Sequence, residues 1–149
     1  MRRALLLGIS AVAALFALTA PASATHVQCG DTITASTTLD SDVLCPDDFG
    51  GTAVWIAADE VDFNLAGHAI RQGQSRTGSG VGIEHQSPLR GSDIKNGTVE
   101  GFAVGVNLRG IDHAVRRLHI KARAYGISSD YEGFVSSGKT GCERSFHHK

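Results

Sequence analysis

Two stretches of the chain, Ile94-Lys95-Asn96-Gly97-Thr98-Val99 and Val115-Arg116-Arg117-Leu118-His119-Ile120, decide the fold because one repeats the other. Val115 follows Ile94 at the same interval at which Ile120 follows Val99. Gly126-Ile127 follows Gly105-Val106 at that interval too. A period of roughly 20 residues between short apolar runs is typical of repeat proteins, in which each turn of chain buries its apolar face against the next.

The repeat extends toward the N-terminus with longer intervals. Val81-Gly82-Ile83 aligns with Val104-Gly105-Val106 at a slightly wider spacing. We predict that Leu65 and Ile70 align with Ile94 and Val99 at a wider spacing still, and that the loop from Gln74 to Ser79 absorbs the excess length.

The residues between the signal-like N-terminus and residue 135 favour strands over helices. Apolar residues occur in short, often alternating runs that are rich in β-branched side chains, and glycine, asparagine and aspartate separate these runs. A β-sandwich would explain the strands but not the regular spacing, and the leucine-and-asparagine pattern of leucine-rich repeats is absent from the sequence. We therefore predict an all-β fold, a parallel β-helix (solenoid) of about four coils over residues 25–135.

The N-terminus predicts export. Arg2 and Arg3 precede an apolar stretch from Ala4 to Ala20, and Ala22-Ser23-Ala24 offers the small residues that signal peptidase requires. We predict a signal peptide over residues 1–24 that is cleaved between Ala24 and Thr25, and a secreted product with no membrane anchor after cleavage. A membrane anchor is the alternative, but the stretch is at the lower length limit for a bilayer span and ends at Pro21.

The charge of the mature chain argues against a nucleic-acid partner. Loss of Arg2 and Arg3 reduces the 14 basic residues to 12, against 15 acidic ones, which gives a net charge of −3. Nucleic-acid binding needs a concentrated basic face, whereas the short run Val115-Arg116-Arg117-Leu118 is typical of a solvated strand edge.

Three cysteines remain after cleavage. Cys29 and Cys45 flank a short segment with turn residues, and in an exported chain such a pair predicts a disulfide. A metal site at this pair would need further ligands, and His26 is the nearest candidate. Cys142 has no predicted partner. It lies in residues 136–149, which we predict to be a polar, disordered tail that leaves the last coil uncapped and open to self-association.

The stretch from Val61 to Ile70, which contains Leu65-Ala66-Gly67-His68-Ala69-Ile70, resembles a turn found in secreted right-handed parallel β-helix proteins of the pectate lyase-like superfamily. The stretch from Ile94 to Phe102 is similar to the next coil of those proteins, and Cys29-Gly30-Asp31-Thr32-Ile33-Thr34 is similar to their entry segment. The resemblance implies a right-handed helix in a short or truncated member. It also implies a groove for an acidic polysaccharide, with calcium held by carboxylates where the relative is a lyase.

Four residues are candidates for ligand binding. Asp112 aligns with Gly91, and Asp62, one coil further back again, would share that column. The two carboxylates would then be two coils apart, about 10 Å, too far to hold one calcium ion without further ligands. Lys95 and Arg116 align with each other and could form a basic strip for an acidic sugar. Solvated turn carboxylates and an ordinary strand edge are the alternatives.

The histidines do not predict a metal site. His68, His85, His113 and His119 fall in different columns of the repeat, so we expect surface histidines and no bound metal.

These observations leave three functions open. The first is a carbohydrate-binding or structural module at the cell exterior, without catalysis. The second is a polysaccharide lyase or epimerase acting on acidic glycans. The third, with least support, is a periplasmic metal-handling protein. No convergent acid-base cluster is visible in the sequence, which favours the first.

Overall fold

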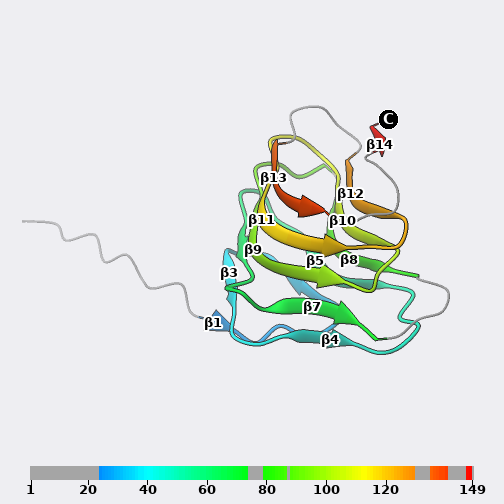
Figure 1. The fold of residues 1–149 in the computed structure, drawn as a ribbon. Helices are drawn as coiled ribbons and strands as arrows, with labels where there is room; N and C mark the ends of the chain where they lie inside the picture. Colours follow the sequence, from blue (N-terminus) through cyan, green and yellow to red (C-terminus); the bar gives the residue numbers. More distant parts are fainter. Residues whose placement is uncertain (1–23, 74–78, 87, 130–134, 141–146, 149) are drawn as a thin grey trace, which may run out of the picture.

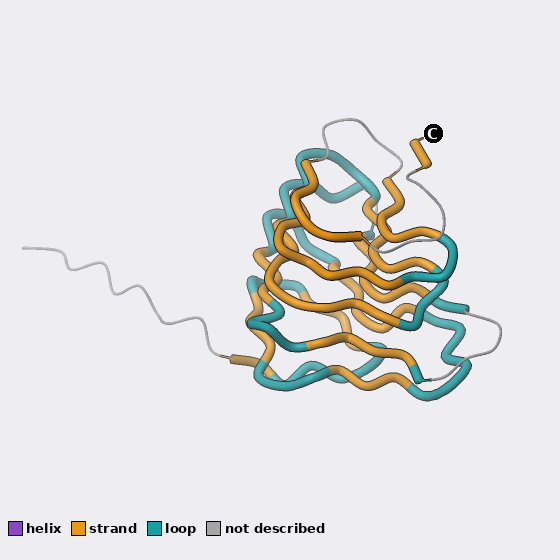
Figure 2. Tube along the Cα trace, viewed as in Figure 1, coloured by secondary structure: helices purple, strands orange, loops and turns teal. Residues whose placement is uncertain are grey.

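The computed structural model describes residues 24–73, 79–86, 88–129, 135–140 and 147–148. All regular secondary structure within these residues is β-strand, connected by turns and loops (Figure 2). Every pair of neighbouring strands runs parallel. The prediction of an all-β fold is therefore confirmed, and parallel pairing distinguishes it from a sandwich built of hairpins.

The strands form two sheets that the chain visits in turn (Figure 1). The six-stranded sheet has the order β14-β12-β10-β8-β5-β2, and the eight-stranded sheet contains the path β1-β3-β6-β9-β11-β13 with β4 and β7 beside it. The strands of the first sheet are β2 (Asp31–Ile33), β5 (Thr52–Ile56), β8 (Val81–His85), β10 (Val104–Leu108), β12 (Tyr125–Ser129) and β14 (His147–His148). Those of the second are β1 (Ala24–Thr25), β3 (Thr37–Leu39), β4 (Val43–Cys45), β6 (Asp62–Asn64), β7 (Ala69–Gln72), β9 (Asp93–Glu100), β11 (Ala114–Lys121) and β13 (Val135–Thr140).

The spacing of the repeat in the sequence matches the register of paired residues in the sheets. Val115 pairs with Ile94 and Ile120 pairs with Val99 between β11 and β9. Val106 of β10 pairs with Ile127 on one side and with Ile83 on the other. Aliphatic side chains therefore lie directly above one another from strand to strand, as the repeat predicts.

One predicted alignment is wrong. Phe63, not Leu65, pairs with Ile94, although Ile70 pairs with Val99 as expected. The sequence interval between paired residues is longer at Phe63 than at Ile70. The reason is that the segment from Phe63 to Ile70, with its turn at Ala66 and Gly67, is two residues longer than the segment from Ile94 to Val99. Both Ala66 and Gly67 have positive φ, so the chain bulges out of the sheet at this corner.

The apolar columns meet between the sheets and form one core. Phe63, Ile94 and Val115 make one column, and Ile70, Val99 and Ile120 make another; their exposed fractions are 1 % or less. Burying each such side chain contributes about 1.5–3 kcal/mol relative to leaving it in water. Since each column spans several strands, a strand keeps its core face covered only while its neighbours are in place.

Glycines in the six-stranded sheet make room for this core. A Cβ on Gly82 would collide with the side chain of Val99, and a Cβ on Gly105 would collide with Ile120. Each would also press on the backbone carbonyl of the next strand, at Gly105 and Gly126. The recurring glycine-valine and glycine-isoleucine pairs of the sequence therefore reflect a close approach between layers, not a flexible loop.

The stretch from Ser136, where we predicted a tail without strands, contributes to both sheets. β13 pairs with β11, and β14 pairs with β12. The six-stranded sheet thus extends beyond the four turns predicted from the repeat. Cys142 and residues 1–23 of the predicted signal peptide (residues 1–24) lie outside the described residues.

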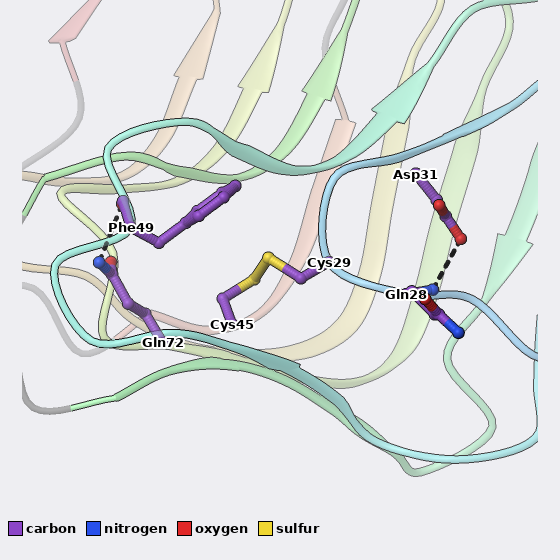
Figure 3. Close-up of a disulfide and its surroundings, with 6 residues drawn as sticks. All are labelled: Gln28, Cys29, Asp31, Cys45, Phe49 and Gln72. Carbon is purple, nitrogen blue, oxygen red and sulfur yellow. Dashed lines mark hydrogen bonds between the residues drawn. A yellow bond between two sulfur atoms is a disulfide. The ribbon is translucent and has the colours of Figure 1, made fainter.

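A disulfide joins Cys29 to Cys45, as predicted (Figure 3). The two Cα atoms are 5.2 Å apart. Cys45 ends β4, so the bond ties the segment before β2 to the far end of the first turn of chain. Phe49 and Gln72 lie beside it, and the Gln72 side-chain amide donates a hydrogen bond of 2.9 Å to the Phe49 carbonyl (Figure 3). A disulfide is typical of proteins in oxidising compartments.

Candidate functional site

A groove of about 620 Å³ runs along the end of the eight-stranded sheet. It crosses β4, β7, β9 and β11, where these strands give way to the turns that follow them. Its lining comprises Leu44, Cys45, Arg71, Gln72, Gly73, Glu100, Gly101, Lys121 and Arg123.

Three of these side chains form a ladder of alternating charge. Arg71 pairs in register with Glu100, and Glu100 pairs in register with Lys121. Arg71 Nε lies 2.9 Å from Glu100 Oε1, and Lys121 Nζ lies 3.6 Å from Glu100 Oε2. Glu100 therefore bridges two cations whose side chains are 49 % and 61 % exposed. The parallel register places the three groups on one outward face by construction.

The groove carries excess positive charge. Arg71, Lys121 and Arg123 are cationic, and Glu100 is the one carboxylate among the described lining residues. Within the described part of the chain, no carboxylate lies within ion-pair distance of Arg123. The groove thus offers an open, cationic surface, which suits a ligand bearing negative charge.

Gly101 lines the groove and leaves it open because it has no side chain. Gly101 has a φ of 92°, and a Cβ there would meet the carbonyl oxygen of Gln72. The Gly101 N–H donates to the carbonyl oxygen of Lys121 at 3.1 Å, which holds the turn against the next strand. A side chain at this position would both strain the backbone and fill the groove.

We did not predict this groove from the sequence, although the signal was present. Arg71, Glu100 and Lys121 directly follow Ile70, Val99 and Ile120, so they share the intervals of that aliphatic column. Neighbouring residues in a strand point to opposite faces, so a column of charge outside had to accompany the column of aliphatics inside.

The predicted basic strip is present but is paired with acid. Lys95 and Arg116 are in register, as expected. Lys95 Nζ lies 2.7 Å from Asp62 Oδ2 and 3.9 Å from Asp93 Oδ2, and Arg116 Nε lies 3.4 Å from Asp93 Oδ1. Two cations and two carboxylates thus alternate on this face, and binding by Lys95, Arg116 or Asp62 stays a prediction.

The predicted column of Asp62 and Asp112 does not form. Asp62 pairs with Asp93, whereas the bridge between Arg90 and Ile111 places Asp112 beside Gly91. The sequence interval from Asp62 to its partner Asp93 is longer than the interval from Ile70 to its partner Val99, because the extra residues of the turn lie between Asp62 and Ile70. Asp112 instead has a φ of 61° at the turn before β11, and its role in binding also stays a prediction.

Two of the histidines are buried, which corrects the expectation of surface histidines. His85 is 0 % exposed and His113 is 4 % exposed, with ring centroids 4.1 Å apart. His85 ends β8, and His113 lies in the turn just before β11. Because one ends a strand and the other lies in a turn, and they belong to different columns, no single spacing in the sequence relates them.

The described residues contain neither a group of side chains suited to a metal ion nor a helix that could span a membrane. Among these residues, no three histidine, cysteine, aspartate or glutamate side chains are grouped so that they could hold a metal ion. None of the described residues belongs to a helix of the length and hydrophobicity that a bilayer span requires.

Comparisons with known proteins assign no activity to the groove. No protein-family model matches the chain, and no curated protein or solved structure matches it either.

Proposed function

We propose that this chain is an exported, right-handed parallel β-helix that binds an acidic polysaccharide in the groove formed by Arg71, Glu100, Lys121 and Arg123. The observation that carries the proposal is the excess of exposed cations in a groove that runs across successive strands. The fold part rests on the alternation of parallel strands between two sheets. The export part rests on the N-terminal sequence and on the disulfide between Cys29 and Cys45.

The geometry suits an extended polyanion better than a compact ion. Arg71 and Lys121 lie on different strands, Arg123 lies in the turn after β11, and neighbouring strands are about 4.8 Å apart. Arg71 on β7 and Lys121 on β11 are therefore separated by two strand spacings, about 10 Å, with Glu100 between them. A chain of uronic acid residues presents carboxylates at intervals along its length. It also presents hydroxyl groups that can donate hydrogen bonds to Glu100.

The expected affinity is modest and sensitive to salt. Exposed charge pairs contribute about 0.2–1 kcal/mol each, so two cationic contacts change affinity by about tenfold. The Debye length falls from about 10 Å at 0.1 M salt to about 3 Å at 1 M. Binding through this groove should therefore weaken strongly across that range.

Two double variants of the full exported chain test the site. The first, Lys121→Gln with Arg123→Gln, removes two groove cations and leaves the close pair of Arg71 and Glu100 intact. The second, Lys95→Gln with Arg116→Gln, removes the same charge from the other strip. Binding to immobilised polygalacturonate and alginate is measured, with dextran as the neutral control.

We expect the groove variant to lose about tenfold in affinity for the acidic polymers. Lys95 and Arg116 are already paired with Asp62 and Asp93, so we propose the groove in place of this strip and expect the second variant to bind as the wild type does. Equal losses in both variants would mean that net charge, not this groove, governs binding. Binding to dextran with the same affinity would also contradict the proposal. Release of products with unsaturated ends, seen as rising ultraviolet absorbance, would reassign the groove to a lyase.

A further inference from the structure

A second polar cluster lies at the opposite end of the sheets from the C-terminus, around His26. This side chain is 63 % exposed, and its Nδ1 atom lies 3.3 Å from Asp40 Oδ1 and 3.1 Å from Ser41 Oγ. The Ser41 hydroxyl donates a hydrogen bond of 2.7 Å to the same Asp40 oxygen. Thr25, the preceding residue, pairs with Leu39 between β1 and β3, which brings His26 next to Asp40.

Signal-peptide cleavage would change the chemistry of this cluster. The proposed cut after Ala24 makes Thr25 the first residue and His26 the second. The α-amine of Thr25, with a typical pKa of about 7.7–8.0, then becomes available as a nitrogen ligand beside the amide and the imidazole of His26. Before cleavage, the same nitrogen is a peptide amide and would have to lose its proton before it could bind a metal.

A histidine at position two forms fused chelate rings with a small divalent metal. The amine nitrogen and the deprotonated amide nitrogen of His26 close a five-membered ring with the metal. The same amide nitrogen and the imidazole Nδ1 close a six-membered ring. The three nitrogens take three corners of a square, and a carboxylate oxygen can take the fourth. Planar sets of nitrogen and oxygen ligands select Cu(II) or Ni(II).

We propose that the mature chain binds one Cu(II) ion through the Thr25 α-amine, the His26 amide nitrogen, His26 Nδ1 and Asp40 Oδ1. The inference rests on the proposed cleavage and is independent of the polysaccharide groove. Nδ1, the nitrogen that the chelate requires, is the one that already faces Asp40. Two ligands bound at about 2.0–2.2 Å and roughly at right angles are about 3 Å apart, close to the 3.3 Å between these two atoms.

The proton balance and the conformational cost are both local. Binding releases the His26 amide proton and, near neutral pH, one proton from the Thr25 ammonium group. The five-membered ring turns the Thr25 backbone away from an extended conformation, so Thr25 gives up its pairing with Leu39. His26 stays beside Asp40 because Val27, which follows it, is 4 % exposed and packed in the core. That cost falls on a single terminal residue. Ser41, through its bond to Asp40, keeps the carboxylate oxygen directed toward the metal.

The test begins with the N-terminus. The full chain is expressed with export, purified, and its first residue determined by mass spectrometry. CuCl₂ is then titrated into the metal-free protein, and visible absorption and electron paramagnetic resonance report the ligand set. We expect Thr25 at the N-terminus, binding of one ion per chain, and the spectra of a tetragonal site with three nitrogens and one oxygen. ZnCl₂ should bind more weakly, since zinc prefers tetrahedral ligands.

Three changes separate this site from other histidines. Acetylation of the α-amine and the His26→Ala variant should each abolish the tetragonal spectrum. Asp40→Asn should weaken binding by about tenfold. His119→Ala, at another exposed histidine, should change nothing. Acetylation leaves the sequence intact, so it is informative even if His26→Ala folds poorly.

The outcomes distinguish this inference from the proposed function. An N-terminus other than Thr25 would overturn the site and the predicted cleavage together. A Thr25 N-terminus with no copper binding, or with binding that survives acetylation, would overturn the copper site alone. Neither result would bear on the binding of polygalacturonate by Lys121 and Arg123.

Discussion

His85 and His113 lie in contact inside the protein and share one hydrogen-bond acceptor. His85 Nδ1 donates to the Arg109 carbonyl at 3.1 Å, and His113 Nε2 donates to the same oxygen at 3.3 Å. The backbone N–H of Ser92 donates to His113 Nδ1 at 3.3 Å. Since a carbonyl only accepts, each ring carries a proton on the nitrogen facing Arg109. His113 Nδ1 accepts from Ser92 and so carries no proton, which makes the His113 ring neutral. His85 Nε2 is buried and has no hydrogen-bond partner among the described residues.

These contacts predict acid sensitivity. Burial lowers the pKa of both His85 and His113, and the nearby His85 ring lowers that of His113 further. The unfolded chain, with histidine pKa values near 6.5, therefore binds these protons before the folded chain does. Stability is fully present above about pH 6.5 and falls as the pH drops below that value, by up to about 1.4 kcal/mol per histidine per pH unit.

Urea unfolding at pH 7.5 and 5.5 measures this loss. The exposed variant His119→Gln should keep the wild-type difference between the two pH values, whereas His85→Gln should reduce it. A wild-type protein equally stable at both pH values would contradict the account. The depressed pKa values of Asp40 and Asp42 cannot cause the effect, because carboxylates titrate below this window.

A substitution at Gly105 tests how closely the two sheets pack. The Gly105→Ala variant places a methyl group against Ile120 and against the carbonyl of Gly126. Overpacking of this kind destabilises by about 1–3 kcal/mol. Gly50→Ala is the matched control, because no atom lies within 4 Å of its added methyl group. Equal urea midpoints for the two variants would show that the layers can move apart at no cost.

Ala66 predicts a gain in stability. Its φ is 52°, a left-handed conformation that costs a residue with a Cβ about 1–2 kcal/mol. Asparagine tolerates this region better and occupies it at Asn96, where φ is 60°. Ala66→Asn should therefore stabilise the protein by about 0.5–1 kcal/mol, measured by urea unfolding. Ala35→Asn, at an exposed alanine without a positive φ, should give no gain.

The disulfide should contribute a further measurable share of the stability. Breaking the bond between Cys29 and Cys45 frees a closed loop with a sequence separation of 16, and the expected loss is about 3 kcal/mol. The comparison is between Cys29→Ala with Cys45→Ala and the parent, both carrying Cys142→Ser so that no other thiol can pair. An unchanged urea midpoint would mean that strand pairing alone fixes this segment.

The sequence was sufficient for the registers where turns have equal length. Ile94 with Val115 and Val106 with Ile127 follow from a fixed spacing, because the chain between them makes the same corners each time. The alignment failed at Leu65, where extra length enters one corner. A spacing cannot show on which side of a strand such an insertion falls, and this error also displaced Asp62 from Asp112.

The candidate site was predictable only in part, for a related reason. Arg71, Glu100 and Lys121 follow the register and could have been found from it. Arg123 lies in a turn, and turns have no repeat to extrapolate. The contact of His85 with His113 joins two corners of different turns, so it depends on how the sheets pack and not on any linear pattern.

The interval between paired residues is the same from β9 to β11 as from β10 to β12, and this equality has a consequence for how such a gene can change length. An in-frame duplication of one such interval would add a strand to each sheet and leave every inward side chain facing inward. A single inserted codon within a strand would instead move the inward side chains of the rest of that strand to the outer face, and the outward ones to the core. Whole-unit duplications and deletions are therefore the length changes that this architecture can absorb.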